Sequence, residues 1–317
     1  MMQPRYISRG LSLRGMLLLL TTATMWGMGP IFIKRFGDYY NVWTQNAFRY
    51  SCAAIILLTW MTLARKPLGN LSRAQWLKLA LVTVTNVLMQ TCYAAAYYFI
   101  YPSVGSLVTR INIVFVILLS FLIFHDERQV IRSPRFILGA MLALGGVSLV
   151  IVGQDARLLA NLHVTRIDFW LGISLVVGFA FFGSLYALSI KHAVRDIPPF
   201  VSFTHVSWMT ALGLCLPMWI MGGMPDLWRQ PLLPLGLMVL TAFLFIVVAH
   251  VCYYAALRDI KAVVSTSVMQ LTPVITCVLS ALVYGDRLTI LQFAGGAMAI
   301  GGATLAALAQ TRVEEAV

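Results

Sequence analysis

Polar side chains at helical spacing interrupt the third long apolar stretch of the chain. Asn86, Gln90, Tyr93 and Tyr97 follow one another at intervals of four, three and four residues, so a helix would align them on one stripe. Amides and phenols inside an apolar segment either line a polar binding site or form hydrogen bonds between helices. The pattern predicts a row of groups that could bind a small polar molecule, with interhelical bonding as the alternative.

A cationic side chain lies in the next apolar stretch. Ser103, Ser106 and Arg110 share a helical face, and Gln270 lies on the equivalent face of a later stretch. Arg110 is about 10 Å deep at a rise of about 1.5 Å per residue, where an arginine costs about 2.5–3.5 kcal/mol on insertion scales. We expect its guanidinium to bind a substrate carboxylate or phosphate, or the carbonyl end of a helix. A structural arginine that reaches toward the surface is the alternative.

Three aromatic or imidazole side chains complete the set of candidates. Trp26 lies in the first apolar stretch, and His250 and Tyr253 lie in the eighth. A histidine can carry a proton near neutral pH, but a single histidine in an apolar helix more commonly accepts or donates a structural hydrogen bond. The predicted substrate-binding residues are Trp26, Asn86, Gln90, Tyr93, Tyr97, Ser106, Arg110, His250, Tyr253 and Gln270.

The sequence contains none of the residue arrangements that are typical of catalytic or metal-binding sites. The five cysteines include no CxxC pair, and the sequence contains no H-E-x-x-H, G-x-S-x-G or Walker motif. No Asp or Glu lies deep in an apolar stretch, which argues against exchange of a cationic drug for protons on a membrane carboxylate. We expect no catalytic residue, no metal site and no cofactor, and therefore not an enzyme.

The elements that position these residues follow from composition. Of 317 residues, 60% are hydrophobic and 11% are charged, whereas soluble domains carry about 25% charged residues. A helix crosses a membrane with about 20 apolar residues. Ten stretches qualify, near residues 14–33, 42–64, 75–98, 103–124, 135–153, 168–190, 199–221, 233–255, 262–284 and 289–309.

The first stretch follows several arginines and could instead be read as a secretory signal peptide. No small-residue cleavage site follows it, and Trp26, Phe32 and Lys34 stand where that site would be. We therefore expect it to be the first spanning helix.

The distribution of basic residues predicts the orientation. With the N-terminus in the cytoplasm, 15 of the 23 Lys and Arg lie in cytoplasmic segments, six lie outside and two lie within spans. Short loops rich in Lys and Arg stay in the cytoplasm. We expect a multi-pass protein of the plasma (inner) membrane with both termini cytoplasmic, and the bias explains the formal net charge of +12 without a nucleic-acid partner.

The two halves of the chain resemble each other. Residues 92–126 align with 252–286 at a constant offset of 160, with 12 identities in 35 positions. Glycines 139, 145 and 146 then match glycines 295, 301 and 302 at an offset of 156. Each half holds five spans, and because five is odd the second half must enter the membrane inverted. The predicted fold is all-α and integral to the membrane, with ten transmembrane helices in two inverted five-helix repeats, 1–153 and 154–317.

These features resemble tandem EamA domains of the drug/metabolite transporter (DMT) superfamily over nearly the whole chain. The first half departs from its mirror at Ile113, which replaces a proline, and at His125-Asp126-Glu127, which leaves the substrate subclass open. The resemblance rests on Trp26-Gly27 followed by Lys34, Arg49, the 92–104 segment and its mirror 252–264, Leu271-Thr272-Pro273-Val274, Gly285-Asp286-Arg287-Leu288 and the glycine-rich fifth and tenth spans.

The resemblance implies a ten-helix basket whose central cavity is lined by spans 1, 3, 4, 6, 8 and 9. It also implies a structural role for Arg49, since many members carry an arginine there. Members mostly export amino acids, other metabolites or toxic compounds. We expect a secondary transporter that exports a small zwitterionic or anionic metabolite by alternating access. A multidrug or toxic-compound exporter is the alternative, and a membrane-embedded enzyme, receptor or scaffold is less favoured.

Small residues recur on the fifth and tenth spans. Gly139 with Ala143, and Gly295 with Ala299, give the spacing of closely packed membrane helices. We expect this stripe to allow close packing either within the fold or at a homodimer contact.

Overall fold

The computed structural model describes residues 13–123, 133–153, 165–193, 197–221, 223, 225–259 and 268–316, and every regular element among them is helical. Several segments discussed above therefore lie outside the described residues: the first arginines, His125-Asp126-Glu127 and residues 260–267 of the mirrored motif. The first half comprises α1 (Leu13–Phe36), α2 (Val42–Leu63), α3 (Arg73–Phe99), α4 (Pro102–Val108), η1 (Thr109–Ile111), α5 (Asn112–Ile123) and α7 (Pro134–Val152).

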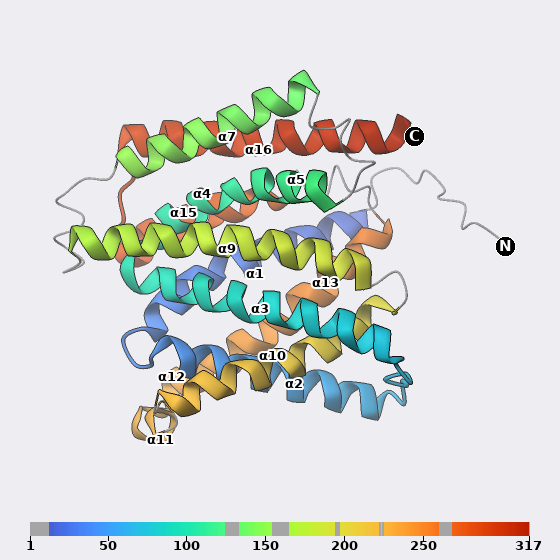
Figure 1. The fold of residues 1–317 in the computed structure, drawn as a ribbon. Helices are drawn as coiled ribbons and strands as arrows, with labels where there is room; N and C mark the ends of the chain where they lie inside the picture. The colour runs from blue at the N-terminus through green and yellow to red at the C-terminus, as the bar shows by residue number, and fades with distance from the viewer. Residues whose placement is uncertain are drawn as a thin grey trace.

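The second half repeats this order (Figure 1). Its elements are α9 (Arg166–Ala193), α10 (Pro199–Ile220), the short α11 (Asp226–Arg229), α12 (Leu232–Thr241), the π-helix η3 (Ala242–Val248), α13 (Ala249–Asp259), α15 (Leu271–Tyr284) and α16 (Ile290–Ala316).

Local sequence signals set several helix ends. Asn41 caps α2 by accepting from the Thr44 amide, and Ser72 and Gln75 form a reciprocal capping box at the start of α3. Prolines occupy the first turn of α4, α7 and α10, where the missing N–H costs nothing. At the end of α15, Gly285 adopts a left-handed conformation with φ 64° and stops the helix.

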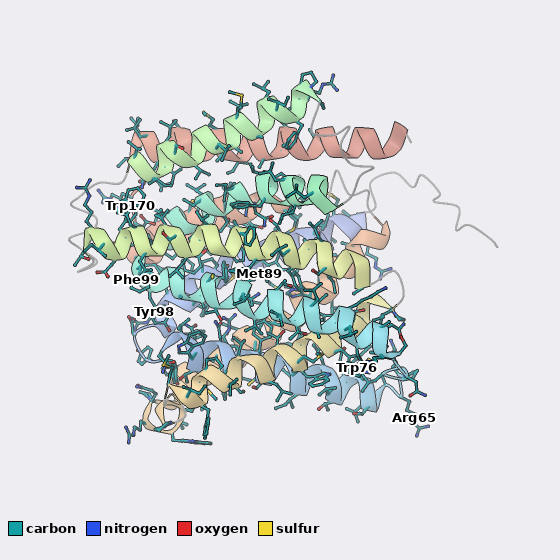
Figure 2. The ribbon with its side chains drawn as sticks, in the orientation of Figure 1. Arg65, Trp76, Met89, Tyr98, Phe99 and Trp170 are labelled. Atoms are coloured by element: carbon teal, nitrogen blue, oxygen red, sulfur yellow. The ribbon has the colours of Figure 1, made fainter. Side chains whose placement is uncertain are left out.

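The lengths and surfaces of the helices define a multi-pass membrane protein. Among the described residues, six helices are long and apolar enough to cross a membrane, and three apolar helices are shorter. Large apolar side chains on them are exposed, such as Leu81 at 57% and Leu212 at 62%, as expected for surfaces in contact with lipid. Trp76 and Trp170, both partly exposed, lie at opposite ends of the helices (Figure 2), where membrane proteins concentrate tryptophan.

Two of the predicted spans are not continuous α-helices. The fourth tightens into the 3₁₀ turn η1, where the Thr109 hydroxyl donates to the Ser106 carbonyl at 2.6 Å. The eighth widens into the π-helix η3. Hydrophobicity predicts which segments cross the membrane as helices. It does not predict where a helix changes from α to 3₁₀ or π geometry, because this change depends on side chains from neighbouring helices.

Helices α7 and α16 run antiparallel along one edge of the bundle (Figure 1). They touch through glycines. A Cβ added to Gly139 would lie 2.8 Å from the Gly302 oxygen, and one added to Gly295 would lie 2.7 Å from the Gly146 oxygen. Adding the offset of 156 to Gly139 and Gly146 gives Gly295 and Gly302, so the two contacts are equivalent. This equivalence is expected if a two-fold axis relates the two halves. The small-residue stripe is thus used inside the chain and needs no second copy.

The halves also interlock through their first helices. α1 packs against α13 and α15 of the second half, while α9 packs against α3 and α5 of the first. At the α1–α15 contact, the Thr276 hydroxyl donates to the Gly27 carbonyl at 2.8 Å. At the α9–α5 contact, the Asn112 amide donates to the Ala180 carbonyl at 2.8 Å. This exchange brings side chains from both halves to the middle of the bundle.

Candidate functional site

Arg110 joins the two halves at the break in the fourth span. From η1, its Nη1 donates to Oε1 of Gln270 at 3.0 Å and its Nη2 donates to the Thr109 hydroxyl at 3.2 Å. Its Nε is enclosed without a hydrogen-bond partner, and no carboxylate in the described part of the chain pairs with it. The structure therefore brings the predicted Arg110 and Gln270 together, and none of the residues it describes supplies an opposite charge to the guanidinium.

Two predicted tyrosines of α3 lie beside this cation. The rings of Tyr93 and Tyr97 meet edge to face with centroids 5.1 Å apart, and Tyr93 also packs on Phe179 at 4.7 Å. The Tyr97 hydroxyl is buried without a hydrogen-bond partner. Arg110 acts electrostatically on both hydroxyl groups. Arg110, Gln270, Tyr93 and Tyr97 thus form one group, which we call the guanidinium–phenol group.

The Asn86 side chain and the Gln90 backbone on α3 contact neighbouring helices. Asn86 donates to the Thr210 hydroxyl of α10 at 2.9 Å, and the Gln90 carbonyl accepts from the Asn46 amide of α2 at 3.1 Å. The alternative interpretation, interhelical hydrogen bonding, therefore describes Asn86. Ser106 also uses its hydroxyl locally, donating to the Ser103 carbonyl at 2.9 Å.

The aromatic candidates form a second group between α1 and α13. Trp26 lies 5.1 Å from the His250 ring and 5.3 Å from the Tyr253 ring, and His250 stacks on Phe203 at 4.7 Å. The His250 Nδ1 is 2.7 Å from the Ile246 carbonyl. We call Trp26, Phe203, His250 and Tyr253 the aromatic group. Nine of the ten predicted residues are therefore divided between two groups and the α3 packing contacts, and Ser106 forms a local bond within α4.

The indole of Trp26 also contacts the π-helix directly. Its Nε1 donates to the Phe245 carbonyl of η3 at 3.2 Å. A widened turn changes the pairing of backbone carbonyls, and π-helical turns are frequent at functional sites. Trp26 thus connects α1 to the irregular part of the eighth span.

Sequence reasoning missed a polar cluster at the far end of α1. Lys34 donates to the carbonyls of Tyr97 and Ile100 at 3.3 Å each, where α3 ends. The buried Asp286 carboxylate accepts from the hydroxyls of Ser103 and Ser280. In the sequence, Lys34 and Asp286 mark the family resemblance, and Lys34 also argues against a signal peptide, but neither is predicted as a site residue. The available signal was the identity of Asp126 and Asp286 in the repeat.

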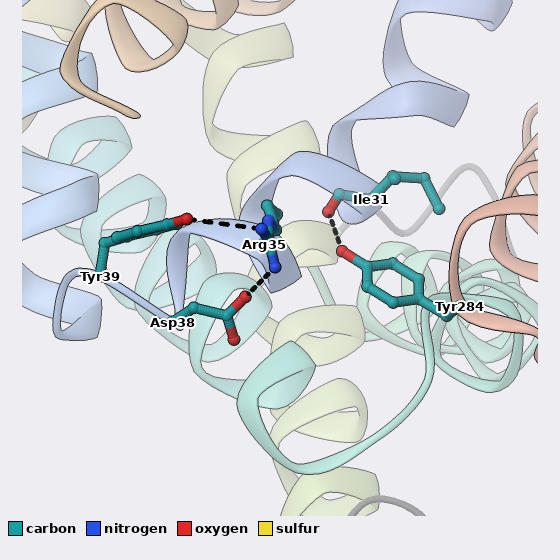
Figure 3. A network of polar contacts seen from close by, with 5 residues as sticks. All are labelled: Ile31, Arg35, Asp38, Tyr39 and Tyr284. Carbon is teal, nitrogen blue, oxygen red and sulfur yellow. Dashed lines mark hydrogen bonds and ion pairs between the residues drawn. The ribbon is translucent and has the colours of Figure 1, made fainter. Parts of the chain in front are cut away.

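We call Lys34, Asp286, Ser103 and Ser280 the Lys34–Asp286 cluster. Two aromatic rings lie next to it. The Lys34 ammonium lies 5.5 Å from the Tyr101 ring centre and 6.0 Å from that of Tyr284. Burial, and then the charge of Asp286, raise the pKa of Tyr101, so its phenol stays neutral. Next to it, Tyr284 donates to the Ile31 carbonyl at 2.7 Å, and Arg35 pairs with Asp38 at 2.7 Å (Figure 3).

Metal binding has no support in the described residues. They contain no group of three or more His, Cys, Asp or Glu that could hold a metal ion. All five cysteines are free.

The helices, their lipid-facing surfaces and the shared interior define a multi-pass helical membrane protein with a repeated architecture. The model of the EamA-like transporter family matches residues 13–152 and 170–308. The chain therefore belongs to the EamA-like transporter family, within the DMT superfamily, and the resemblance found in the sequence is confirmed.

Solved structures support the fold. One, described as "Crystal structure of protein", superposes with a TM-score of 0.61 at 17% identity, covering 95% of this chain and 98% of the other. At this identity the match shows the fold alone. No curated protein matches the sequence.

Proposed function

We propose that the protein is a secondary transporter that exports a small zwitterionic or anionic metabolite, such as an amino acid. The observation that carries this proposal is the guanidinium of Arg110, held by Gln270 and left without a carboxylate among the described residues. A buried cation without an opposite charge is costly, so a substrate carboxylate would complete the site. Family membership supports transport as the reaction class.

The proposed topology is ten spans in two inverted halves, with both termini in the cytoplasm and the protein in the plasma (inner) membrane. The reciprocal contacts of α7 with α16 support the inversion. The orientation rests on the bias of Lys and Arg toward loops on the side of the N-terminus.

The positions of the contacts support transport by alternating access. Arg110 belongs to the first half and Gln270 to the second, so rocking of one half against the other would part them. A substrate that binds Arg110 would replace the amide contact and favour one arrangement over the other. Tyr93, Tyr97 and Gln90 would hold the remaining polar groups of the substrate.

The aromatic group supports the second candidate, export of drug-like or toxic compounds. Trp26, Phe203, His250 and Tyr253 offer flat apolar faces next to the polar stripe. Flat, weakly polar compounds bind such surfaces by stacking. An assay that includes both compound classes separates the two candidates.

Transport by purified protein in liposomes tests the proposal. We expect uptake of a labelled amino acid or organic anion from a panel measured with and without a pH gradient. Arg110→Ala should reduce uptake about tenfold or more, because hydrogen bonds to charged groups contribute about 1.5–3 kcal/mol. Arg35→Ala is the matched control, because Arg35 is exposed and pairs only with the nearby Asp38 and Tyr39.

Correct insertion is checked by chromatographic behaviour of each variant in detergent. Wild-type rates for well-inserted Arg110→Ala protein would overturn the site assignment. Uptake of aromatic drugs alone, insensitive to Arg110, would favour the second candidate.

A further inference from the structure

A second buried guanidinium lies on α2. Arg49 is 6% exposed, and its Nε is enclosed without a hydrogen-bond partner. Within the described residues its side chain forms no hydrogen bond and no ion pair. A structural arginine in a helix bundle normally donates to carbonyls or carboxylates, because it has five N–H donors and a permanent charge. Arg49 therefore lacks the contacts that its expected structural role would require.

Arg49 and Arg110 both act electrostatically on one tyrosine of α3. The Tyr93 hydroxyl lies within electrostatic reach of both guanidinium groups. The Asn46 contact to the Gln90 carbonyl, one turn before Arg49, holds α2 against this stretch of α3. A Cβ on Gly29 would lie 3.8 Å from the Tyr93 oxygen, so the tyrosine hydroxyl is directed toward α1 in the bundle interior. The two cations thus belong to different helices but act on the same tyrosine.

Several donors around Tyr93 have no partner. The Nε of Arg49, the Nε of Arg110 and the hydroxyl of Tyr97 are all buried without hydrogen bonds. Unpaired polar groups in protein interiors are rare and each costs free energy. A bound anion would accept from the two guanidinium nitrogens among them.

No carboxylate among the described residues serves this purpose. Every described membrane-spanning helix either contains no Asp or Glu or carries them within three residues of an end. Three of the described carboxylates are already engaged: Asp38 by Arg35, Asp168 by Thr165, and Asp286 by two serines. Because no described carboxylate balances the two charges in the interior, a bound anion would stabilise them.

We propose that Arg49 and Arg110 form a two-cation site for a substrate with two anionic groups, of the dicarboxylate type. One carboxylate binds each guanidinium, and Tyr93 and Tyr97 donate between them. A monoanion would leave one buried cation unbalanced, so the site favours the doubly charged ligand. This rests on the proposed function, since it narrows the class of anionic metabolite that the protein carries.

Binding to the purified full-length protein in detergent tests the charge count directly. The probes are succinate and succinamate, which share a skeleton but differ by one carboxylate replaced with an amide. We expect wild-type protein to bind succinate about tenfold or more tightly than succinamate by calorimetry, because one charge-assisted contact is lost. Equal affinities, or no binding of either probe, would overturn the proposal.

Variants assign the preference to its residues. Arg49→Gln should reduce the succinate preference to about threefold or less, because one of the two charge-assisted contacts is lost. Arg49→Lys keeps the charge and should retain a clear preference. Arg35→Gln, which removes an exposed arginine, should leave the ratio at the wild-type value. If folded Arg49→Gln protein kept the full preference for succinate over succinamate, the role of Arg49 would be overturned. If that variant does not fold, the ratio of the two affinities in the wild-type protein tests the proposal.

Transport distinguishes this inference from the proposed function. In liposomes, glutamate should be carried in preference to glutamine, which has one carboxylate fewer. Selective binding of succinate without transport of any probe would contradict the proposed function but not the two-cation site. Transport of glutamine and glutamate at equal rates would contradict the two-cation site but not the proposed function.

Discussion

At the scale of single residues, the Lys34–Asp286 cluster shows how charges can be stable at a membrane helix end. Lys34 does not pair directly with Asp286 but donates to two carbonyls at the end of α3, where the helix leaves them unpaired. The helix dipole adds to this attraction, because a cation is favourable at a helix C-terminus. Asp286 is balanced by serine hydroxyls from both halves. Each charge is therefore satisfied mainly by neutral dipoles.

The first prediction concerns Asp286. Asp286→Ala removes the acceptor of Ser103 and Ser280 and should destabilise the protein by about 2 kcal/mol, within the range for hydrogen bonds to charged groups. Unfolding in detergent, followed by circular dichroism during heating, measures the change as a lower Tm. Asp38→Ala is the control, because its ion pair with Arg35 is exposed and contributes little. Equal Tm values for the two variants would contradict a structural role for the cluster.

At the scale of elements, the α7–α16 pair depends on the absence of side chains. A Cβ on Gly146 would meet the Ala299 nitrogen and lie 2.5 Å from the Gly295 oxygen, both of which are backbone atoms of a facing helix. Backbone cannot rotate away as a side chain can, so the helices must separate. Packing of small residues is a main source of helix association in membranes, because lipid removes the hydrophobic driving force.

Gly146→Ala should therefore destabilise the protein by about 1–3 kcal/mol, the usual cost of overpacking. Gly301→Ala is the matched control on α16, because nothing lies within 4 Å of its added Cβ. Alanine also favours helix over glycine, so the control should unfold at the wild-type temperature or slightly above it. The heating experiment used for Asp286 measures both, and a stable Gly146→Ala protein would contradict the described contact.

The sequence predicts the positions of the helices better than the places where their geometry departs from a regular α-helix. Apolar stretches and the 160-residue offset locate the helices and pair Arg110 with Gln270, which occupy equivalent positions in the two halves. The 3₁₀ turn at Arg110 and the π-helix near His250 depend on contacts between helices, which periodicity does not encode. The role of Asn86 could not be decided from its spacing either, because a binding stripe and a packing stripe have the same period.

At the scale of the whole molecule, the two halves are connected by exchange of their first helices. α1 lies against the second half and α9 lies against the first, so neither half encloses a polar interior by itself. Cross-half hydrogen bonds lie along this contact, from Thr276 to Gly27 and from Tyr284 to Ile31. Rocking between the halves would have to break or rearrange these bonds, as alternating access requires.

The inverted arrangement makes a prediction about sidedness. α1 and α9 are equivalent helices of the two halves, and in an inverted pair they start on opposite sides of the membrane. Arg65, which follows α2 at the end where α1 begins, and Arg166, which begins α9, are both exposed. Single cysteines at these positions should react with a membrane-impermeant maleimide from opposite sides: Arg65→Cys from the cytoplasm and Arg166→Cys from outside.

The unmodified protein measures the background from its five native cysteines, which are partly buried within helices. Permeabilised membranes provide the control in which both variants should react fully. Reaction of both cysteines from one side of intact membranes would mean that the second half enters in the same sense as the first. The reciprocal contacts of Gly139 and Gly295 would then need another origin, since two parallel repeats would place α7 and α16 parallel rather than antiparallel.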